Sequence, residues 1–403
     1  MNSHRSFPSS VFILFLGIGI MPRRVAGDKN FLLDLSDFLT RNQVSHHFAS
    51  IAGKPDFADL QSDIITYLPR PFHGNPTRYY YRSTGGSFFG YHHKHTNLRE
   101  YIEVSSALVY HVATLRALLR PYSQVIVQWM DMSGLVPVVR FACGARARYL
   151  CLVPRYVPQG PFGNWLRGWA LQYADQLITS TNASKELLVQ HRCRRERIAV
   201  TPWGSRGIVS REQDATIFTR APQSKTRLIW AGYIQQIQSE DFLAAIALAQ
   251  QVVAVRADIE FTFCLKPESF KSEFQIFQRP GIRIEKGDAH FLDNLINYDG
   301  FFSPVLHTQS ALAPPLTWIE ALSVGVPVIT TRCQGITELL TEGKSALIFS
   351  DYQSIQQWLM SETRLDQKLR AMRNFAKQEF DQRYNIEIVG ARYLDLYRRL
   401  VEQ

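Results

Sequence analysis

Residues 313–347, APPLTWIEALSVGVPVITTRCQGITELLTEGKSAL, carry the strongest fold signal in the chain. Pro314 and Pro315 predict the start of a helix, because their fixed φ suits a first turn whose N–H groups lack helical partners. An apolar stripe at helical spacing follows, with Glu320 off the stripe. Gly325 predicts the end of this helix.

A strand and a second helix complete the unit. Residues 326–331, VPVITT, are apolar and β-branched, which is typical of a strand buried on both faces. Residues 334–340, QGITELL, predict a helix after a glycine turn. A helix N-terminus at a cleft binds anions, and Glu320 one turn further in would suit the vicinal diol of a ribose. Two interpretations stay open here: a nucleotide-diphosphate site, or an ordinary helix–strand–helix unit with Glu320 on a solvated face.

The segment resembles the donor-binding core of retaining nucleotide-sugar glycosyltransferases of the family-4 type. Residues 320–329, EALSVGVPVI, and 334–340 are similar to two motifs of that family. Weaker similarity covers nearly the whole chain, at 11–27, 173–180 (YADQLITS), 198–204 (IAVTPWG) and 227–232 (RLIWAG).

This resemblance implies an α/β protein with two facing Rossmann-like domains, the GT-B fold, and a C-terminal helix that crosses back to the first domain. The expected parts are an acceptor-side domain at 11–204, a linker at 205–225, a donor-nucleotide domain at 226–380 and a return helix at 381–403.

The resemblance also implies an activity: transfer of a sugar from a nucleotide-diphosphate sugar to an acceptor hydroxyl, with retention. Glu320 would bind the donor ribose, and the helix start would face the diphosphate. The expected donor-binding residues are Glu320, Thr317, Leu316, Pro315, Gly232, Tyr233, Lys266, Gly27 and Lys29. Asp131 is the expected catalytic group, although a lone Asp after an apolar strand is as often a helix cap. No cofactor or metal is expected, because helix N-termini can carry the phosphate charge.

The sequence departs from the family at two places. The first acid of the family's E-x7-E motif falls on Leu312, and residues 232–239, GYIQQIQS, lack the basic pair that clamps the diphosphate. Each lost donor to such a charge costs about 3–4 kcal/mol. Lys266, which follows an apolar strand, is one candidate replacement. The departures keep a second hypothesis open, a non-catalytic GT-B scaffold or glycan- or lipid-binding subunit, and a third, a nucleotide-sugar epimerase.

Positive charge is concentrated in the first half of the chain. Residues 1–205 hold 23 Lys and Arg against 12 Asp and Glu, within a chain of net charge +10. This favours an anionic partner, namely a glycan or lipid-linked acceptor or an acidic membrane surface, over a merely solvated basic surface. No nucleic-acid partner is expected, since no reader motif appears.

The N-terminal apolar run and the cysteines bear on location. Residues 11–21 imitate a signal peptide, but an amphipathic helix follows directly from Asp28, which favours a first strand and its glycine loop. No apolar run reaches the roughly 18–20 residues that span a bilayer. Five scattered cysteines indicate a reduced, intracellular protein. The expected location is the cytoplasm, either free or peripheral on the inner face of a membrane.

Two stretches of the first domain allow other roles. Residues 67–97 mix aromatic, glycine and basic residues and predict an acceptor- or membrane-contacting loop; its three histidines lack a metal-site pattern. Residues 155–169 place Phe162, Trp165, Leu166 and Trp169 at helical spacing. A stripe that faces the core is the favoured interpretation, and a face that dips into a membrane is the alternative.

Overall fold

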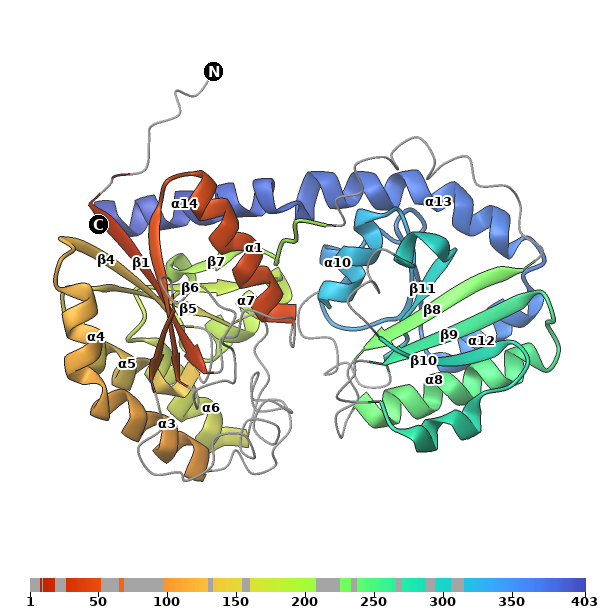
Figure 1. The fold of residues 1–403 in the computed structure, drawn as a ribbon, viewed down its shortest axis with the longest axis horizontal. Coiled ribbons are helices and arrows are strands. Elements are labelled where there is room, and N and C mark those ends of the chain that lie inside the picture. Colours follow the sequence, from red (N-terminus) through yellow and green to blue (C-terminus); the bar gives the residue numbers. More distant parts are fainter. Residues whose placement is uncertain are drawn as a thin grey trace, which may run out of the picture. The chain divides into compact units, whose positions relative to one another are not determined.

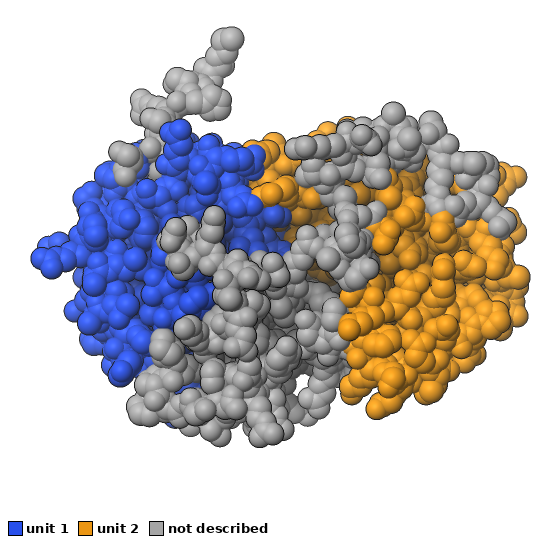
Figure 2. Space-filling model, in the orientation of Figure 1, with its two compact units in different colours: residues 1–203, 389–403 blue, residues 204–388 orange. Residues whose placement is uncertain are grey.

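The computed structural model describes residues 8, 10–18, 27–51, 65–68, 98–129, 133–153, 160–207, 225–232, 238–265, 270–287, 294–305 and 315–403. The chain forms two compact units (Figures 1 and 2). Unit 1 comprises Met1–Trp203 together with Val389–Gln403, and unit 2 comprises Gly204–Ile388.

Unit 1 is built on a parallel sheet of seven strands in the order β3-β2-β1-β4-β5-β6-β7. The strands are β1 (Val11–Ile18), β2 (Ser45–Ile51), β3 (Ile65–Leu68), β4 (Gln124–Trp129), β5 (Arg148–Leu152), β6 (Gln176–Thr179) and β7 (Ile198–Val200). The strand order reverses between β1 and β4, so chain connections leave this point in opposite directions. In such sheets, ligands bind beyond the carboxyl ends of the strands at the reversal.

The N-terminal apolar run forms the central strand of this sheet. β1 pairs with β2 on one side and β4 on the other, and Val11–Leu16 are 0–3% exposed. A continuous apolar run is expected of a parallel strand with both faces covered. The prediction of a strand here is confirmed over Val11–Ile18.

Helices cover both faces of the first sheet (Figure 1). The helices of unit 1 are α1 (Gly27–Arg41), α3 (Leu98–Tyr110), α4 (Val112–Leu119), α5 (Val136–Cys143), α6 (Gly160–Leu171) and α7 (Asn182–Gln190), with 3₁₀ turns η3 (Ser133–Leu135) and η4 (Arg195–Arg197). Alternate residues of β4, such as Val127 and Trp129, enter the core shared with α3, α4 and α5. Gln128 faces the other way and accepts a hydrogen bond of 2.6 Å from the Tyr397 hydroxyl of the C-terminal helix.

That C-terminal helix, α14 (Ile386–Glu402), begins in unit 2 and ends on unit 1. Its Gly390 lies so close to α1 that a Cβ there would fall 2.5 Å from the Phe38 ring. The Tyr393 ring centroid lies 5.4 Å from that of Phe31. The sequence therefore supplies a glycine where two helices approach most closely and aromatic rings around it.

The solvent face of α6 contradicts one prediction. Trp165, Leu166 and Trp169 are 55%, 40% and 42% exposed, so they do not face the core. The side that packs inward carries Arg167, Gly168 and Leu171 instead. Arg167 and Leu171 are buried, and Gly168 lies against the carbonyl of His191, just after α7, where a Cβ would fall 2.4 Å from that oxygen. Helical spacing fixes which side chains share a face, but not which face meets the sheet.

Two histidines on β2 make the stability of unit 1 sensitive to pH. His46 Nε2 lies 2.7 Å from Ser36 Oγ, and His47 Nε2 lies 2.8 Å from Thr66 Oγ1. Burial lowers the pKa of both imidazoles below the ordinary 6.5.

We expect unit 1 to lose stability as pH falls below about 6.5, because the unfolded chain then binds protons that the folded chain does not. Thermal unfolding at pH 7.5 and 5.5 measures this loss. A variant with His46→Gln and His47→Gln should show a flatter dependence, and an unchanged slope would contradict the assignment.

Unit 2 contains a parallel sheet of six strands in the order β10-β9-β8-β11-β12-β13. The strands are β8 (Thr226–Gly232), β9 (Ile259–Leu265), β10 (Ile282–Lys286), β11 (Gly300–Phe302), β12 (Val328–Thr331) and β13 (Ala346–Phe349). The helices are α8 (Gln238–Val253), α10 (Leu316–Ser323), α11 (Ile336–Leu339), α12 (Tyr352–Ser361) and α13 (Leu365–Glu379), with 3₁₀ turns η5 (Ser272–Phe277) and η6 (Leu295–Asn297) and a π-helix η7 (Phe380–Tyr384). Helices α8 and α12 pack together, and α10 packs against α13.

The described residues contain no single helix that is long and apolar enough to cross a membrane. One pair, Tyr101–Tyr110 with Val112–Leu119, passes jointly on length and composition but is bent by 56°.

Candidate functional site

The candidate site lies at the carboxyl edge of the second sheet. Its strand order reverses between β8 and β11, the position at which open α/β sheets bind ligands. Gly232 is the last residue of β8, and a Cβ on it would fall 2.9 Å from the Trp230 ring. Two predicted site residues, Tyr233 after β8 and Lys266 after β9, lie outside the described residues.

The segment that follows β11 is held rigidly by the neighbouring strand. Thr330 Oγ1 donates to the Ser303 carbonyl at 2.8 Å, and the Val305 N–H donates to Thr331 Oγ1 at 2.9 Å. The same Thr331 hydroxyl donates to the Val305 carbonyl at 2.5 Å. Two threonines at the end of a buried strand thus satisfy the backbone of the next loop, as buried polar groups require.

Tyr352, the first residue of α12, ties this segment to α8. Its hydroxyl lies 3.0 Å from the Pro304 carbonyl and 3.3 Å from the Asp241 carbonyl. Burial raises the pKa of Tyr352, so the hydroxyl stays protonated and can donate. These bonds hold residues 303–305 against β12 and α8 at the edge of the site.

Helix α10 starts and ends as predicted. Pro315 occupies its N-cap, where it has no side-chain oxygen to cap the first N–H groups, and the Trp318 N–H donates to the Pro315 carbonyl at 2.8 Å. Gly325 has a φ of 71°, and the Val326 N–H donates back to the Ala321 carbonyl at 2.9 Å. Helices commonly end in this way, with a glycine in the left-handed region and a hydrogen bond from the next residue to a carbonyl of the last turn. Leu316 and Thr317 form the first turn and carry the N–H groups that a capless helix offers to an anion.

Glu320 is buried, with 6% of its surface exposed. The interpretation that placed it on a solvated face is therefore wrong. α10 is covered on nearly all sides, and Trp318 beside Glu320 is fully buried as well. The sequence left this open, because an amphipathic pattern does not show what packs on each face, and α10 packs against both α13 and the π-helix. Carboxylates are rarely buried without a structural or functional partner.

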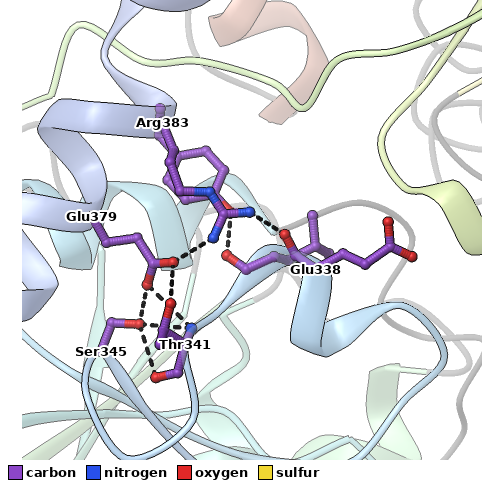
Figure 3. A network of polar contacts seen from close by, with 7 residues as sticks. Glu338, Thr341, Ser345, Glu379 and Arg383 are labelled. Carbon is purple, nitrogen blue, oxygen red and sulfur yellow. Dashed lines mark hydrogen bonds and ion pairs between the residues drawn. The ribbon is translucent and has the colours of Figure 1, made fainter.

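Helix α11 has only four residues and is anchored from outside (Figure 3). Gly335 leads into it with a φ of 79°. At its other end, the Glu338 carbonyl accepts a hydrogen bond from the Arg383 guanidinium, and the Leu339 carbonyl accepts one from the Tyr384 hydroxyl. Figure 3 shows the Glu338 carboxylate pointing away from Arg383.

Glu379 is the centre of this polar network. The side chain is 7% exposed and accepts hydrogen bonds from the Thr341 hydroxyl at 2.8 Å and the Thr341 N–H at 3.2 Å. The Ser345 hydroxyl donates to it, and Arg383 forms an ion pair with it (Figure 3). The network fixes the loop after α11 to the junction of α13 and the π-helix.

The two chain segments at the boundary of unit 2 also meet at this junction. The Ser205 N–H donates to the Tyr384 carbonyl, and the Ile386 N–H donates to the Ser205 carbonyl, both at 2.9 Å. Ser205 and Asn385 form a parallel bridge. The sequence indicates this junction only through the i,i+4 spacing of Glu379 and Arg383, a pattern too common to single out.

One electrostatic feature at the edge opposes an anion. The first turn of α8, which follows β8, contains Glu240 and Asp241. Acidic side chains there occupy the positive end of the helix dipole. Together with the sequence of 232–239, this leaves α8 without the basic clamp of the family.

Two of the predicted residues of unit 1 lie at the start of α1, the helix that follows β1. Gly27 is the first residue of α1, and Lys29 lies in its first turn, after β1. Asp131 follows the end of β4 at Trp129 by two residues and lies outside the described residues, as do 69–97 and Leu312.

The five cysteines are free and buried: Cys143, Cys151, Cys193, Cys264 and Cys333. Burial raises the pKa of Cys143 to about 12 and of Cys193 to about 11, so both thiols stay protonated at neutral pH. In the part of the chain that the structure describes, no three His, Cys, Asp or Glu side chains gather as metal ligands would.

Comparisons with known proteins find likeness in structure but not in sequence. No protein-family model matches the chain, and no curated protein matches it. HepE of Anabaena in complex with UDP has a TM-score of 0.65 at 13% identity, over 96% of this chain and 99% of that one. A glycosyltransferase of Rickettsia africae has a TM-score of 0.66 at 13% identity, over 97% and 99%. A point mutant of S. aureus TarM, in complex with fondaparinux, alpha-GlcNAc-glycerol and UDP, has a TM-score of 0.68 at 10% identity, over 96% and 99%.

The chain has the GT-B fold. The prediction of an α/β protein with two Rossmann-like domains and a returning C-terminal helix is confirmed by full-length likeness and by the two parallel sheets. A GT-B fold hosts different activities, so function depends on the site itself.

Proposed function

We propose that this GT-B protein is a glycosyltransferase that moves a sugar from a nucleotide-diphosphate sugar to an acceptor hydroxyl. The observation that carries the proposal is the buried Glu320 on the proline-started helix α10, at the ligand-binding edge of a fold shared along its length with glycosyltransferases. HepE and TarM were each solved with UDP, which supports a nucleotide donor.

In this proposal unit 2 binds the donor. Glu320 accepts hydrogen bonds from the ribose hydroxyls, while the first turn of α10 at Pro315, Leu316 and Thr317 faces the diphosphate. Gly232, the last residue of β8, lies beside the diphosphate. Tyr233 and Lys266 follow the adjacent strands, and Lys266 supplies the positive charge that the stretch at 232–239 lacks. In this scheme the transfer of the sugar needs no metal ion or other cofactor.

Unit 1 receives the acceptor in this scheme. Its basic character suits a glycan or an anionic lipid-linked saccharide, as in polysaccharide biosynthesis at the inner face of a membrane. Asp131 is the proposed polar group at the acceptor, with Gly27 and Lys29 beside the donor. Transfer with retention and family-4 membership follow from the motif resemblance at 320–340.

A second candidate function is a GT-B subunit that binds a glycan or lipid without transferring sugar. The acidic first turn of α8 favours it, because Glu240 and Asp241 weaken the positive end of a helix that should face a diphosphate.

Ligand-dependent unfolding separates these candidates. UDP, GDP and ADP are each added to the full chain, and a ligand at about one hundred times its dissociation constant should stabilise the protein by about 2.7 kcal/mol. The matching nucleotide sugars are then tested for transfer or hydrolysis by product mass. Failure of all three nucleotides to stabilise the chain would overturn the donor site. Stabilisation without turnover of any donor would favour the non-catalytic subunit.

A further inference from the structure

The outer face of α6 is apolar where a surface helix is normally polar. Trp165, Leu166 and Trp169 fall within an arc of about 100° on a helix of 3.6 residues per turn, and each is at least 40% exposed. The opposite side is buried at Arg167 and Leu171. A helix on the surface of a globular domain normally turns its apolar stripe inward, whereas this apolar stripe of α6 faces outward.

The apolar surface continues past the end of the helix. Tyr173 is 39% exposed, and its ring centroid lies 5.1 Å from that of Trp169 in an edge-to-face arrangement. We call Trp165, Leu166, Trp169 and Tyr173 the α6 patch. Three of its four side chains are tryptophan or tyrosine, the residues that concentrate at the interface between a bilayer and water.

Arginines surround the C-terminal end of the α6 patch. The Arg140 guanidinium donates to the Tyr173 carbonyl at 2.9 Å, and Arg197 donates to the Gln172 and Ala174 carbonyls at 3.4 Å. The loop after α7 lies against the same helix, because the His191 carbonyl contacts Gly168 of α6, and this loop contributes further arginines. The arginine rim, so defined, consists of Arg140, Arg192, Arg194, Arg195 and Arg197.

Nearby acids neutralise only part of this charge. Asp175 lies 3.5 Å from Arg140, Glu186 pairs with Arg195, and Glu196 is exposed within the rim itself, so three acids accompany the five arginines. Arg192 and Arg194 are exposed on the same loop. The combination of an aromatic patch and a net positive rim matches a bilayer with acidic headgroups: the rings enter the interface, and the guanidinium groups meet lipid phosphates.

We propose that the α6 patch and the arginine rim dock unit 1 on an anionic lipid bilayer. This surface belongs to unit 1, whereas the proposed donor site belongs to unit 2, and it differs from the carboxyl edge of the first sheet. Asp175, which follows the patch, accepts a hydrogen bond of 2.8 Å from the Tyr149 N–H at the start of β5. The C-terminal end of α6 therefore lies at the amino edge of the first sheet, whereas ligands bind at the carboxyl edge. Docking through it leaves the carboxyl edge open.

Vesicle binding by the full chain tests the proposal. We expect sedimentation with vesicles of phosphatidylcholine and phosphatidylglycerol, weakened by added salt, and little with phosphatidylcholine alone. The double variant with Trp165→Ala and Trp169→Ala should bind about tenfold or more weakly. The variant with Arg192→Glu and Arg194→Glu should lose about fivefold for each cation removed. Of the seven tryptophans, all in described residues, Trp165 and Trp169 are the exposed ones, so wild-type fluorescence should shift to the blue on binding.

A matched control comes from unit 2. Phe375 is an exposed aromatic residue with the Lys344 ammonium 5.8 Å from its ring centroid, and Phe375→Ala should leave vesicle binding unchanged. Stabilisation by UDP should be the same in all these variants, which separates this surface from the donor site. The proposal is overturned by absence of wild-type binding to anionic vesicles, or by binding that both double variants retain. It is also overturned if the tryptophan variant instead dissociates a dimer in solution, since a second copy would then cover the patch.

Discussion

Replacing Glu320 with glutamine should weaken nucleoside diphosphate binding by about a hundredfold while leaving the fold intact. A carboxylate that accepts two hydrogen bonds from a ribose contributes about 1.5–3 kcal/mol through each, because bonds to charged groups are the stronger kind. Glutamine has the same shape but keeps one neutral acceptor and adds a donor. The measurement is calorimetric titration with the nucleotide that stabilises the wild type.

If Glu320 binds the ribose, nucleotide binding should depend on the two ribose hydroxyls. The wild type should prefer that nucleotide over its 2′,3′-dideoxy analogue, and Glu320→Gln should lose most of that preference. Such a cycle isolates the contact between the carboxylate and the diol from any general damage. If the variant discriminates between the two nucleotides as well as the wild type does, Glu320 does not bind the ribose.

Glu342 provides the matched control. It is an exposed glutamate in the loop after α11, paired with Arg332 at 3.1 Å. An exposed pair of this kind contributes little, so Glu342→Gln should change neither nucleotide affinity nor stability measurably. Glutamine fills the same buried volume, and circular dichroism of Glu320→Gln without ligand checks that the fold is intact.

The sequence predicts most accurately those parts of the fold whose signals are local. The prolines before α10 and Gly325 after it act on backbone dihedrals, and the structure confirms both ends of the helix. β1 was predictable because a central parallel strand is apolar on both faces. These signals need no knowledge of what packs against the element.

Predictions of which helix face is buried were less accurate, because burial depends on the element that packs against that face. The pattern of α10 left open whether Glu320 lies on a solvated face, and the structure shows it buried. The pattern of α6 places three apolar residues on one side correctly, yet Arg167, Gly168 and Leu171 pack inward and the side with the tryptophans faces out. Periodicity gives the arc of a stripe, and tertiary contacts decide its direction.

The Glu379 network had no usable sequence signal at all. Its carboxylate meets Thr341 and Ser345, which precede it by 38 and 34 residues. Small hydroxyl residues in a loop are too common to indicate a distant buried acid. Only the structure identifies the Glu379 carboxylate as part of the network that anchors α11.

Removing the charge of Glu379 should destabilise unit 2 by about 3 kcal/mol. Breaking a buried ion pair by changing one partner leaves the other without compensation, a loss of about 3–5 kcal/mol in well-buried cases. The lower end applies here, because the Arg383 side chain is 35% exposed and water solvates part of its charge. Glu379→Gln also turns an amide N–H₂ toward donors from Thr341, Ser345 or Arg383. Urea unfolding followed by circular dichroism measures the loss.

The same helical stretch offers an internal control. Lys377 and Asp381 form an i,i+4 ion pair at 2.6 Å, with side chains 28% and 45% exposed. Asp381→Asn should cost less than about 1 kcal/mol, as exposed pairs do. Equal effects of Asp381→Asn and Glu379→Gln would show that the network is an ordinary surface pair.

The network should also couple the site to the segment that leaves unit 2. Arg383 and Tyr384 hold the carbonyls of α11, and the Tyr384 carbonyl accepts from Ser205 on the entering segment. Because these residues share partners, Glu379→Gln and Arg383→Met should be strongly non-additive: the double variant should cost little more than the larger single change. Additive losses would mean that Glu379 and Arg383 stabilise α11 independently, and the junction would then not act as one unit.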